Sequence, residues 1–151
     1  MNIPMNAFLQ ELLAKGTSDT AGLDGVWIGL YIGINASPGP NLTMANLTEA
    51  SYDGYARQQV GAWTEPYLSS DGQNAVIDGA LHFRPSDSSF PQTMLGALYG
   101  SSSVSGGGNL IMIDPFPAPG VGLLGPNNVL SYVPEFELPA GGNYGGGDVL
   151  S

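Results

Sequence analysis

Few residues in this chain could carry out acid–base or nucleophilic catalysis, and His82 is its single histidine. It falls in an alternating stretch, 74–84, where it would share a strand face with Asp78 and Arg84. A serine nucleophile beside His82 and Asp78 would make a Ser-His-Asp hydrolase. The chain has no nucleophile-elbow motif, however, and the serines of 101–105 have the composition of a turn. We therefore expect His82 to be a surface or interface residue, and we expect no catalytic residues.

Glu135 and Glu137 are two residues apart, so on a strand they would share one face. Such a pair could serve glycoside hydrolysis or bind a hard cation. It could equally form a charged strand edge that discourages pairing with other chains, and we favour this interpretation. One histidine and no cysteine cannot build a typical zinc site. The glycine runs 106–108 and 145–147 lack the lysine of a phosphate-binding loop, so we expect no metal and no cofactor.

The charge balance of the chain is strongly acidic, with 13 acidic residues, 3 basic residues and a formal net charge of −10. A field of this sign repels phosphate backbones and anionic lipid surfaces, so we expect neither nucleic-acid nor membrane binding. No apolar run approaches the roughly 20 residues of a membrane span, and the first residues lack the features of a signal peptide. We expect a soluble protein made in a cytoplasm, whose acidic surface maintains solubility or complements a basic partner.

Residues 4–15 carry the clearest helix signal, because their apolar residues recur at the spacing of one helical face. Pro4 suits a first helical turn and Gly16 suits the end of the helix. A helix of about three turns is marginal alone in water, so it needs a groove on its own sheet or on a neighbouring subunit. The candidate protein-interface residues on this face are Met5, Phe8, Leu9, Leu12 and Leu13.

The rest of the chain predicts short strands, because 23 glycines and 12 prolines interrupt its apolar runs. Residues 27–35 alternate, with aliphatic side chains on one face and two glycines on the other, which leave room for a close neighbour. Further strands are predicted at 74–84, 94–99, 110–113 and 129–138; in the last, Pro134 indicates a bulge or an edge strand. This pattern favours a mainly β fold, an antiparallel, jelly-roll-like β-sandwich with one short N-terminal amphipathic helix.

Three regions follow from this pattern. Residues 1–24 would form an N-terminal helix and linker arm, 25–140 the β-sandwich domain, and 141–151 a glycine-rich tail with too little apolar content to fold alone.

The central stretch, 49–63, is predicted to form a turn followed by a strand. Asp53 and Gly54 form a tight-turn pair, and we predict a strand from Tyr55 to Trp63 with Arg57 on the same face. Arg57 could stack on nearby rings or pair with an acidic neighbour, Glu49 or Asp53. The surrounding aromatic residues could bind sugars or partners, or pack in the core; they are Trp27, Tyr31, Tyr52, Tyr55, Trp63 and Tyr67.

Residues 47–57, L-T-E-A-S-Y-D-G-Y-A-R, with Trp63 after them, resemble the E-x-S-Y-x-G-Y-x-R…W signature of small structural proteins of tailed bacteriophages. Three shorter elements resemble parts of the same proteins in the same order, G-L-Y-I-G at 29–33, G-G-N-L-I at 107–111 and F-E-L-P-A-G at 136–141. The resemblance spans about 25–142. The matching structural-motif residues are Tyr52, Gly54, Tyr55, Arg57 and Trp63.

This resemblance implies a β-sandwich virion component without catalytic residues, whose relatives are head-decoration, fibre-base or tail-associated proteins. We expect a capsid decoration (cement) protein on the capsid surface that binds the major capsid protein, as a homo-oligomer and most simply a trimer. The alternative is a tail- or fibre-associated protein with carbohydrate-binding aromatic side chains. The chain departs from the family in its N-terminal helix and in its longer glycine-rich end.

Overall fold

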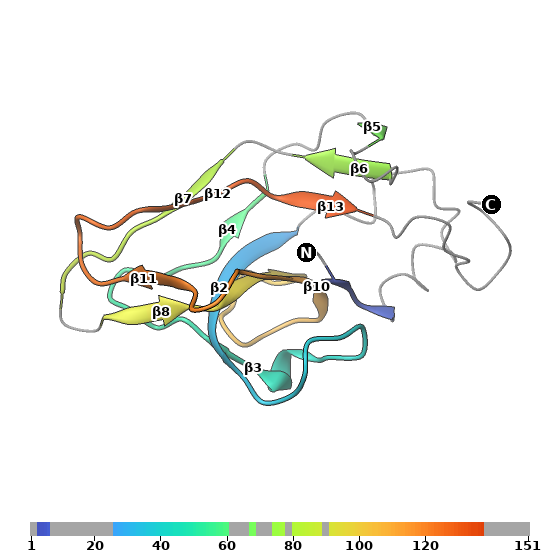
Figure 1. Cartoon of the computed structure of the whole chain (residues 1–151), viewed down its shortest axis with the longest axis horizontal. Coiled ribbons are helices and arrows are strands. Elements are labelled where there is room, and N and C mark those ends of the chain that lie inside the picture. Colours follow the sequence, from blue (N-terminus) through green and yellow to red (C-terminus); the bar gives the residue numbers. More distant parts are fainter. Residues whose placement is uncertain are drawn as a thin grey trace, which may run out of the picture.

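The computed structural model describes residues 3–6, 26–60, 67–68, 74–77, 80–88 and 91–137. Within these residues the chain is mainly β, and every strand pairing is antiparallel, as predicted (Figure 1). The strands are β1 Ile3–Pro4, β2 Trp27–Ile34, β3 Leu47–Glu49, β4 Gln58–Gln59, β5 Tyr67–Leu68, β6 Asn74–Ile77, β7 Leu81–Phe83, β8 Gln92–Met94, β9 Gly96–Gly100, β10 Leu110–Pro115, β11 Val121–Leu123, β12 Leu130–Tyr132 and β13 Glu135–Glu137. A short 3-10 helix spans Met44–Asn46.

The largest sheet has the order β1-β10-β9-β2-β3, with β4 also paired to β2. β2, β9 and the first four residues of β10 lack charged side chains, so these parts of the sheet can be covered on both faces. Strands form within both apolar runs, 94–99 and 110–113, as predicted; all five residues of β9 are buried, as are Leu110 to Ile113 of β10. β2 forms where it was predicted, but burial does not alternate along it, because residues 28–31 are all buried and Ile32 and Ile34 are half-buried.

Three predicted strands are each divided: 74–84 contains β6 and β7, 94–99 includes the end of β8 and most of β9, and 129–138 contains β12 and β13. β8 pairs with β11 and β9 pairs with β10, but the two pairings have different registers. Leu95 lies between β8 and β9, and its backbone N–H donates to the carbonyl of Tyr31 in β2. Residues 129–138 were predicted as one strand, yet β12 pairs with β7 and β13 pairs with β6. Pro134 lies in the interruption, as its missing N–H requires.

The N-terminus corrects part of the helix prediction. Pro4 belongs to β1, not to a first helical turn, because Ile3–Pro4 pairs with β10 at the edge of the large sheet. An edge strand tolerates proline, which has no N–H to donate. Met5 follows with its side chain 1% exposed, so it packs in this domain's own core and is not available to a partner. Phe8, Leu9, Leu12 and Leu13 lie outside the described residues.

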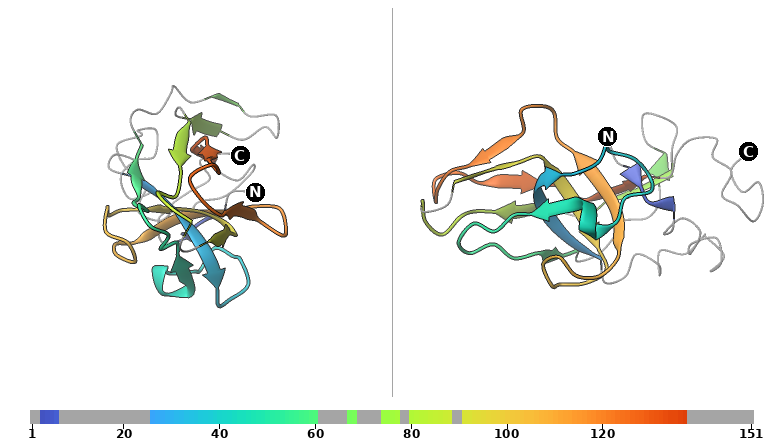
Figure 2. Two further views of the ribbon diagram at one scale, coloured as in Figure 1. Left: turned by 90° about the vertical axis from the view of Figure 1, so that its left-hand side faces the viewer. Right: turned by 90° about the horizontal axis from the view of Figure 1, so that it is seen from below.

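The core lies between the large sheet and the segments of β7, β11 and β12. Phe83, Leu123, Leu130 and Tyr132 from these segments belong to the same buried cluster as the residues of β2, β9 and β10. Figure 2 shows these segments and the large sheet from two further directions. No helix among the described residues is long and apolar enough to cross a membrane.

Candidate functional site

The Asp53-Gly54 turn has the predicted geometry. Tyr55 donates its backbone N–H to the carbonyl of Tyr52 (3.0 Å), and Gly54 has φ +87°, a conformation that favours glycine. The turn is tied to the next loop, because Ser86 donates its N–H to the Asp53 carbonyl (2.9 Å) and its hydroxyl to the Asp53 carboxylate (2.5 Å). Of the strand predicted from Tyr55 to Trp63, Gln58–Gln59 pair with β2 within the described residues 55–60, and residues 61–63 lie outside the described part of the chain.

Arg57 pairs with Glu49, one of the three interactions that the sequence left open. Its Nε donates to Oε2 and its Nη2 to Oε1 of Glu49, both at 2.8 Å, in a bidentate arrangement. The side chains are 0% and 8% exposed, so the ion pair is buried. Tyr55 donates its hydroxyl to the same Oε2 (2.5 Å) and accepts the backbone N–H of Leu30 in β2 (3.0 Å). We call these three side chains the signature network.

The signature network also fixes the loop between β9 and β10, residues 101–108. Arg57 Nη1 donates to the carbonyls of Ser102 (2.7 Å) and Gly107 (3.1 Å), and the Gly106 N–H donates to Glu49 Oε1 (2.7 Å). A serine- and glycine-rich loop would otherwise be flexible. The buried ion pair therefore provides acceptors and donors that hold this loop in one conformation.

Two strand glycines make room for the network. A Cβ on Gly29 would lie 2.5 Å from the Tyr55 hydroxyl and 2.9 Å from Glu49 Oε2. A Cβ on Gly100 would lie 2.8 Å from Arg57 Nη1. The prediction that the glycine face of β2 admits a close neighbour is confirmed at Gly29, where the neighbour is the network itself.

Electrostatics keep the network in its charged form. Burial alone would raise the pKa of Glu49, but hydrogen bonds from Arg57, Tyr55 and the Gly106 N–H, with the charge of Arg57, hold that pKa below its usual value. Burial and the hydrogen bond to Glu49 raise the pKa of Tyr55. Glu49, Tyr55 and Arg57 are thus all bound to other groups of this chain, and the fully buried Arg57 guanidinium has a structural role.

A second buried network, the tyrosine chain, joins the large sheet to β12 and β13. The hydroxyls of Tyr99 and Tyr132 are 2.6 Å apart, and Tyr132 donates to Asp114 Oδ2 (2.7 Å). Tyr99 also accepts the Glu135 N–H (2.9 Å) and lies within hydrogen-bond distance of its carbonyl (3.0 Å). The two rings meet edge to face at 6.2 Å. The sequence analysis did not identify this chain, since its members are far apart in sequence.

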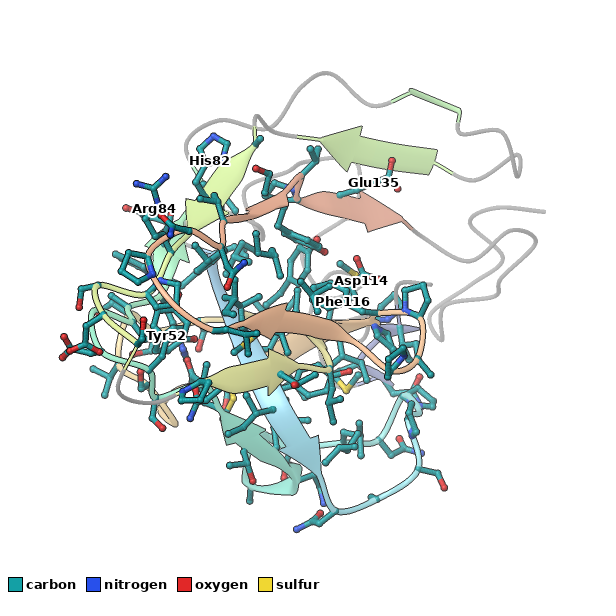
Figure 3. The ribbon with its side chains drawn as sticks, turned by 60° about the vertical axis from the view of Figure 1, so that its left-hand side comes forward. Tyr52, His82, Arg84, Asp114, Phe116 and Glu135 are labelled. Carbon is teal, nitrogen blue, oxygen red and sulfur yellow. The ribbon has the colours of Figure 1, made fainter. Side chains whose placement is uncertain are left out.

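The residues first considered for catalysis do not form one site in the described residues. His82 in β7 and Arg84 directly after β7 are both exposed, as predicted for a surface histidine (Figure 3), and His82 Nδ1 is 2.8 Å from Ser131 Oγ. Asp78 lies outside the described residues. Glu135 begins β13, and the side chain of Glu137 is not described. Among the described residues, no group of three or more His, Asp or Glu side chains could hold a metal ion.

Of the described aromatic residues, Tyr31 and Tyr52 pack in the core, Tyr55 belongs to the signature network, and Trp27 is half-buried at the start of β2. Tyr31 and Tyr52 are 1% and 4% exposed, so neither offers a face to a sugar. Tyr52 meets the ring of Tyr55 edge to face, with ring centroids 5.3 Å apart. Trp63 and the side chain of Tyr67 are outside what the structure describes.

Comparison with known proteins adds no relative. No protein-family model matches the chain, and neither curated proteins nor solved structures yield a similar protein.

Proposed function

We propose that this chain is a structural protein of a tailed-bacteriophage virion, a decoration or cement protein that binds the major capsid protein on the head. The observation that carries the proposal is the signature network. Glu49, Tyr55 and Arg57, which resemble the phage-protein signature, bind one another directly, with Gly54 in the turn between them. The resembling residues therefore act as one unit that sets a fold, which is what a structural module requires.

The finer fold belongs to this proposal. The large sheet and the paired segments β6–β13 and β7–β12 would form the two layers of a jelly-roll-like sandwich. The shared core and the tyrosine chain support this arrangement, because both join the large sheet to the other segments. Residues 25–140 would then be the adhesive domain, with the apolar arm before it reaching a neighbouring subunit.

The tail- or fibre-associated alternative has less support in its carbohydrate-binding form. Glycan recognition uses exposed aromatic faces, whereas Tyr31 and Tyr52 are buried and the Tyr55 hydroxyl is committed to Glu49. A tail location without glycan binding is distinguished from a head location by the co-sedimentation experiment that follows.

The test is co-sedimentation of the purified chain with heads, and separately with tails, of the phage whose genome carries its gene. We expect binding to heads that lack the protein and none to tails. Binding to tails alone would move the protein to the alternative, and binding to neither would overturn the proposal.

The arm is tested without touching the domain. Deleting residues 1–15 would also remove β1 and the buried Met5, so Leu9→Asp and Leu12→Asp are preferable. Both change the apolar face of the predicted helix, and Gln10→Asp is the matched control on its polar face. We expect the two leucine variants to lose head binding while Gln10→Asp retains it. Normal binding by all three would show that the arm is not the contact.

A further inference from the structure

The three basic residues of this acidic chain differ in what they bind. Arg57 is fully buried and is committed to Glu49. Lys15 lies outside the described residues. Arg84 is exposed, and within the described residues its guanidinium forms no hydrogen bond and no ion pair. Arg84 is thus the one lysine or arginine side chain that is exposed to solvent in the described part of the chain.

The backbone that carries Arg84 is held on both sides. Phe83 before it is 1% exposed and pairs with β12, and Pro85 after it is buried. One residue further, Ser86 donates both its N–H and its hydroxyl to Asp53. A side chain on a fixed backbone loses less conformational entropy on binding than one on a flexible loop. Arg84 is therefore exposed from a position that is already ordered.

Two further hydrogen-bonding groups lie beside Arg84. His82 is two residues before it, and both side chains point away from the core (Figure 3). His82 faces Ser131 across the β7–β12 pair, and its Nδ1 is 2.8 Å from Ser131 Oγ. The His82 carbonyl accepts a hydrogen bond from Gln58 Nε2 (2.6 Å), so β7 is also held from β4. An imidazole, a hydroxyl and a guanidinium thus share the outward side of these two strands.

Two exposed valines flank these polar groups. Val129 and Val133, which are 42% and 46% exposed, lie two residues before and after Ser131, so all three share the outward side of β12. Neither 80–84 nor 129–133 contains an acidic residue, although the whole chain has a net charge of −10. Arginine beside apolar side chains is a composition that protein interfaces favour. We call these side chains the basic face: His82, Arg84, Val129, Ser131 and Val133.

We propose that the basic face binds a carboxylate on the surface of a partner protein, with Arg84 pairing the carboxylate and the valines packing against apolar side chains around it. Charge complementarity indicates the partner, because a guanidinium without an internal partner matches a carboxylate in sign and in bidentate geometry. The other exposed charged residues of the described part, Asp53 and Asp87, would repel such a group. Nucleic acid fits less well, since its phosphates are repelled by the net charge of −10 and offer the valines no apolar contact.

The partner of the proposed function is the major capsid protein, and in that respect this inference rests on it. The measurement is the affinity of the purified chain for heads that lack it. Arg84→Gln should weaken head binding by about tenfold or more, and added salt should weaken wild-type binding more than that of the variant. Arg84→Lys should bind with intermediate affinity, because it keeps the charge without the bidentate geometry. Thr48→Glu, on the exposed side of β3, changes the net charge by the same amount as Arg84→Gln and should bind like the wild type.

The outcomes separate this inference from the proposed function. Wild-type binding to heads with equal binding by Arg84→Gln would overturn the inference and leave the proposed function standing, whereas no wild-type binding would overturn both. An equal loss in Thr48→Glu would also overturn the inference, because net charge and not the basic face would then decide binding. Wild-type binding that nuclease treatment of the heads abolishes would assign the face to nucleic acid instead. Circular dichroism of each variant confirms folding.

Discussion

The two buried networks of this molecule differ in charge and in what they join. The signature network is built on the ion pair between Arg57 and Glu49. It joins β2, β3 and the loop 101–108, which all belong to the large sheet or to its connections. The tyrosine chain uses neutral hydroxyls of Tyr99 and Tyr132, and it joins that sheet to β12 and β13. One network fixes a loop, and the other joins two parts of the core.

The difference shows what a buried charge contributes. Removing an ion pair from water costs several kcal/mol per ion, so it adds little net stability over apolar packing. Its partners are nevertheless fixed, because an unpaired buried charge is far more costly than an unpaired hydroxyl. The signature network therefore determines a loop conformation, whereas the tyrosine chain mainly adds stability.

The largest effect is expected from Arg57→Met, which leaves the Glu49 carboxylate buried without its cation. We expect a loss of about 3–5 kcal/mol in the free energy of unfolding. Urea denaturation measures this loss, and Arg84→Met, at an exposed position directly after β7, is the matched control, with a change of about 0.5 kcal/mol or less. Amide hydrogen exchange should also accelerate in loop 101–108, at Gly106 above all. Unchanged exchange there would show that the network does not hold the loop.

Tyr132→Phe removes one hydroxyl from the tyrosine chain, and with it the bond to Tyr99 and the bond to Asp114. We expect a loss of about 1–3 kcal/mol in the free energy of unfolding, and no change of exchange in loop 101–108. Ser131→Ala, one residue away and exposed, should cost about 0.5 kcal/mol or less. If Tyr132→Phe loosened loop 101–108 as much as Arg57→Met, the two networks would not be separate.

Gly54→Ala strains the turn inside the signature without removing any polar partner. Its φ of +87° disfavours a side chain, so we expect about 1 kcal/mol of destabilisation. Gly39→Ala is the control, because its nearest new neighbour would be 3.9 Å away. Equal melting temperatures for the two variants would contradict the turn geometry.

The smallest effect concerns pH, and its sign differs between Glu49 and the two tyrosines of the tyrosine chain. The lowered pKa of Glu49 gives a stabilisation that is present at neutral pH and lost as pH falls below the usual glutamate range, about 4, through the folded pKa. Burial raises the pKa of Tyr99 and of Tyr132, so their contribution is present below about pH 10 and lost as pH rises. The measurement is the free energy of unfolding as a function of pH. Glu49→Gln should reduce its fall at acid pH, and Tyr132→Phe should reduce its fall at alkaline pH. An effect of Glu49→Gln at alkaline pH alone, or of Tyr132→Phe at acid pH alone, would contradict this assignment.

Much of the fold could be predicted from local pattern. Alternation located β2, continuous apolar runs located β9 and β10, and Asp53-Gly54 located a turn, because each depends on neighbours in sequence. Pro4 was misplaced because a proline suits a first helical turn as well as an edge strand, and the pairing with β10 decides between them.

The site was predicted only in part. Glu49 was among the possible partners of Arg57, but the choice over Asp53 depends on the position of β3 beside β2. The bonds to Ser102 and Gly107 span 45 and 50 residues, and no local signal reveals them. Gly100, the last residue of β9, leaves space for Arg57, and a glycine at this end of the predicted strand is a sequence signal of that close approach.

The central claim is that this module acts by adhesion to a phage head, and the thermal stability of heads tests it most directly. Heads that lack the protein are heated with and without the purified chain, and disruption is followed by release of their DNA. A protein that binds the intact head should raise the disruption temperature, because binding stabilises the bound state. An unchanged disruption temperature at saturating protein, with no protein on the heads, would contradict the account.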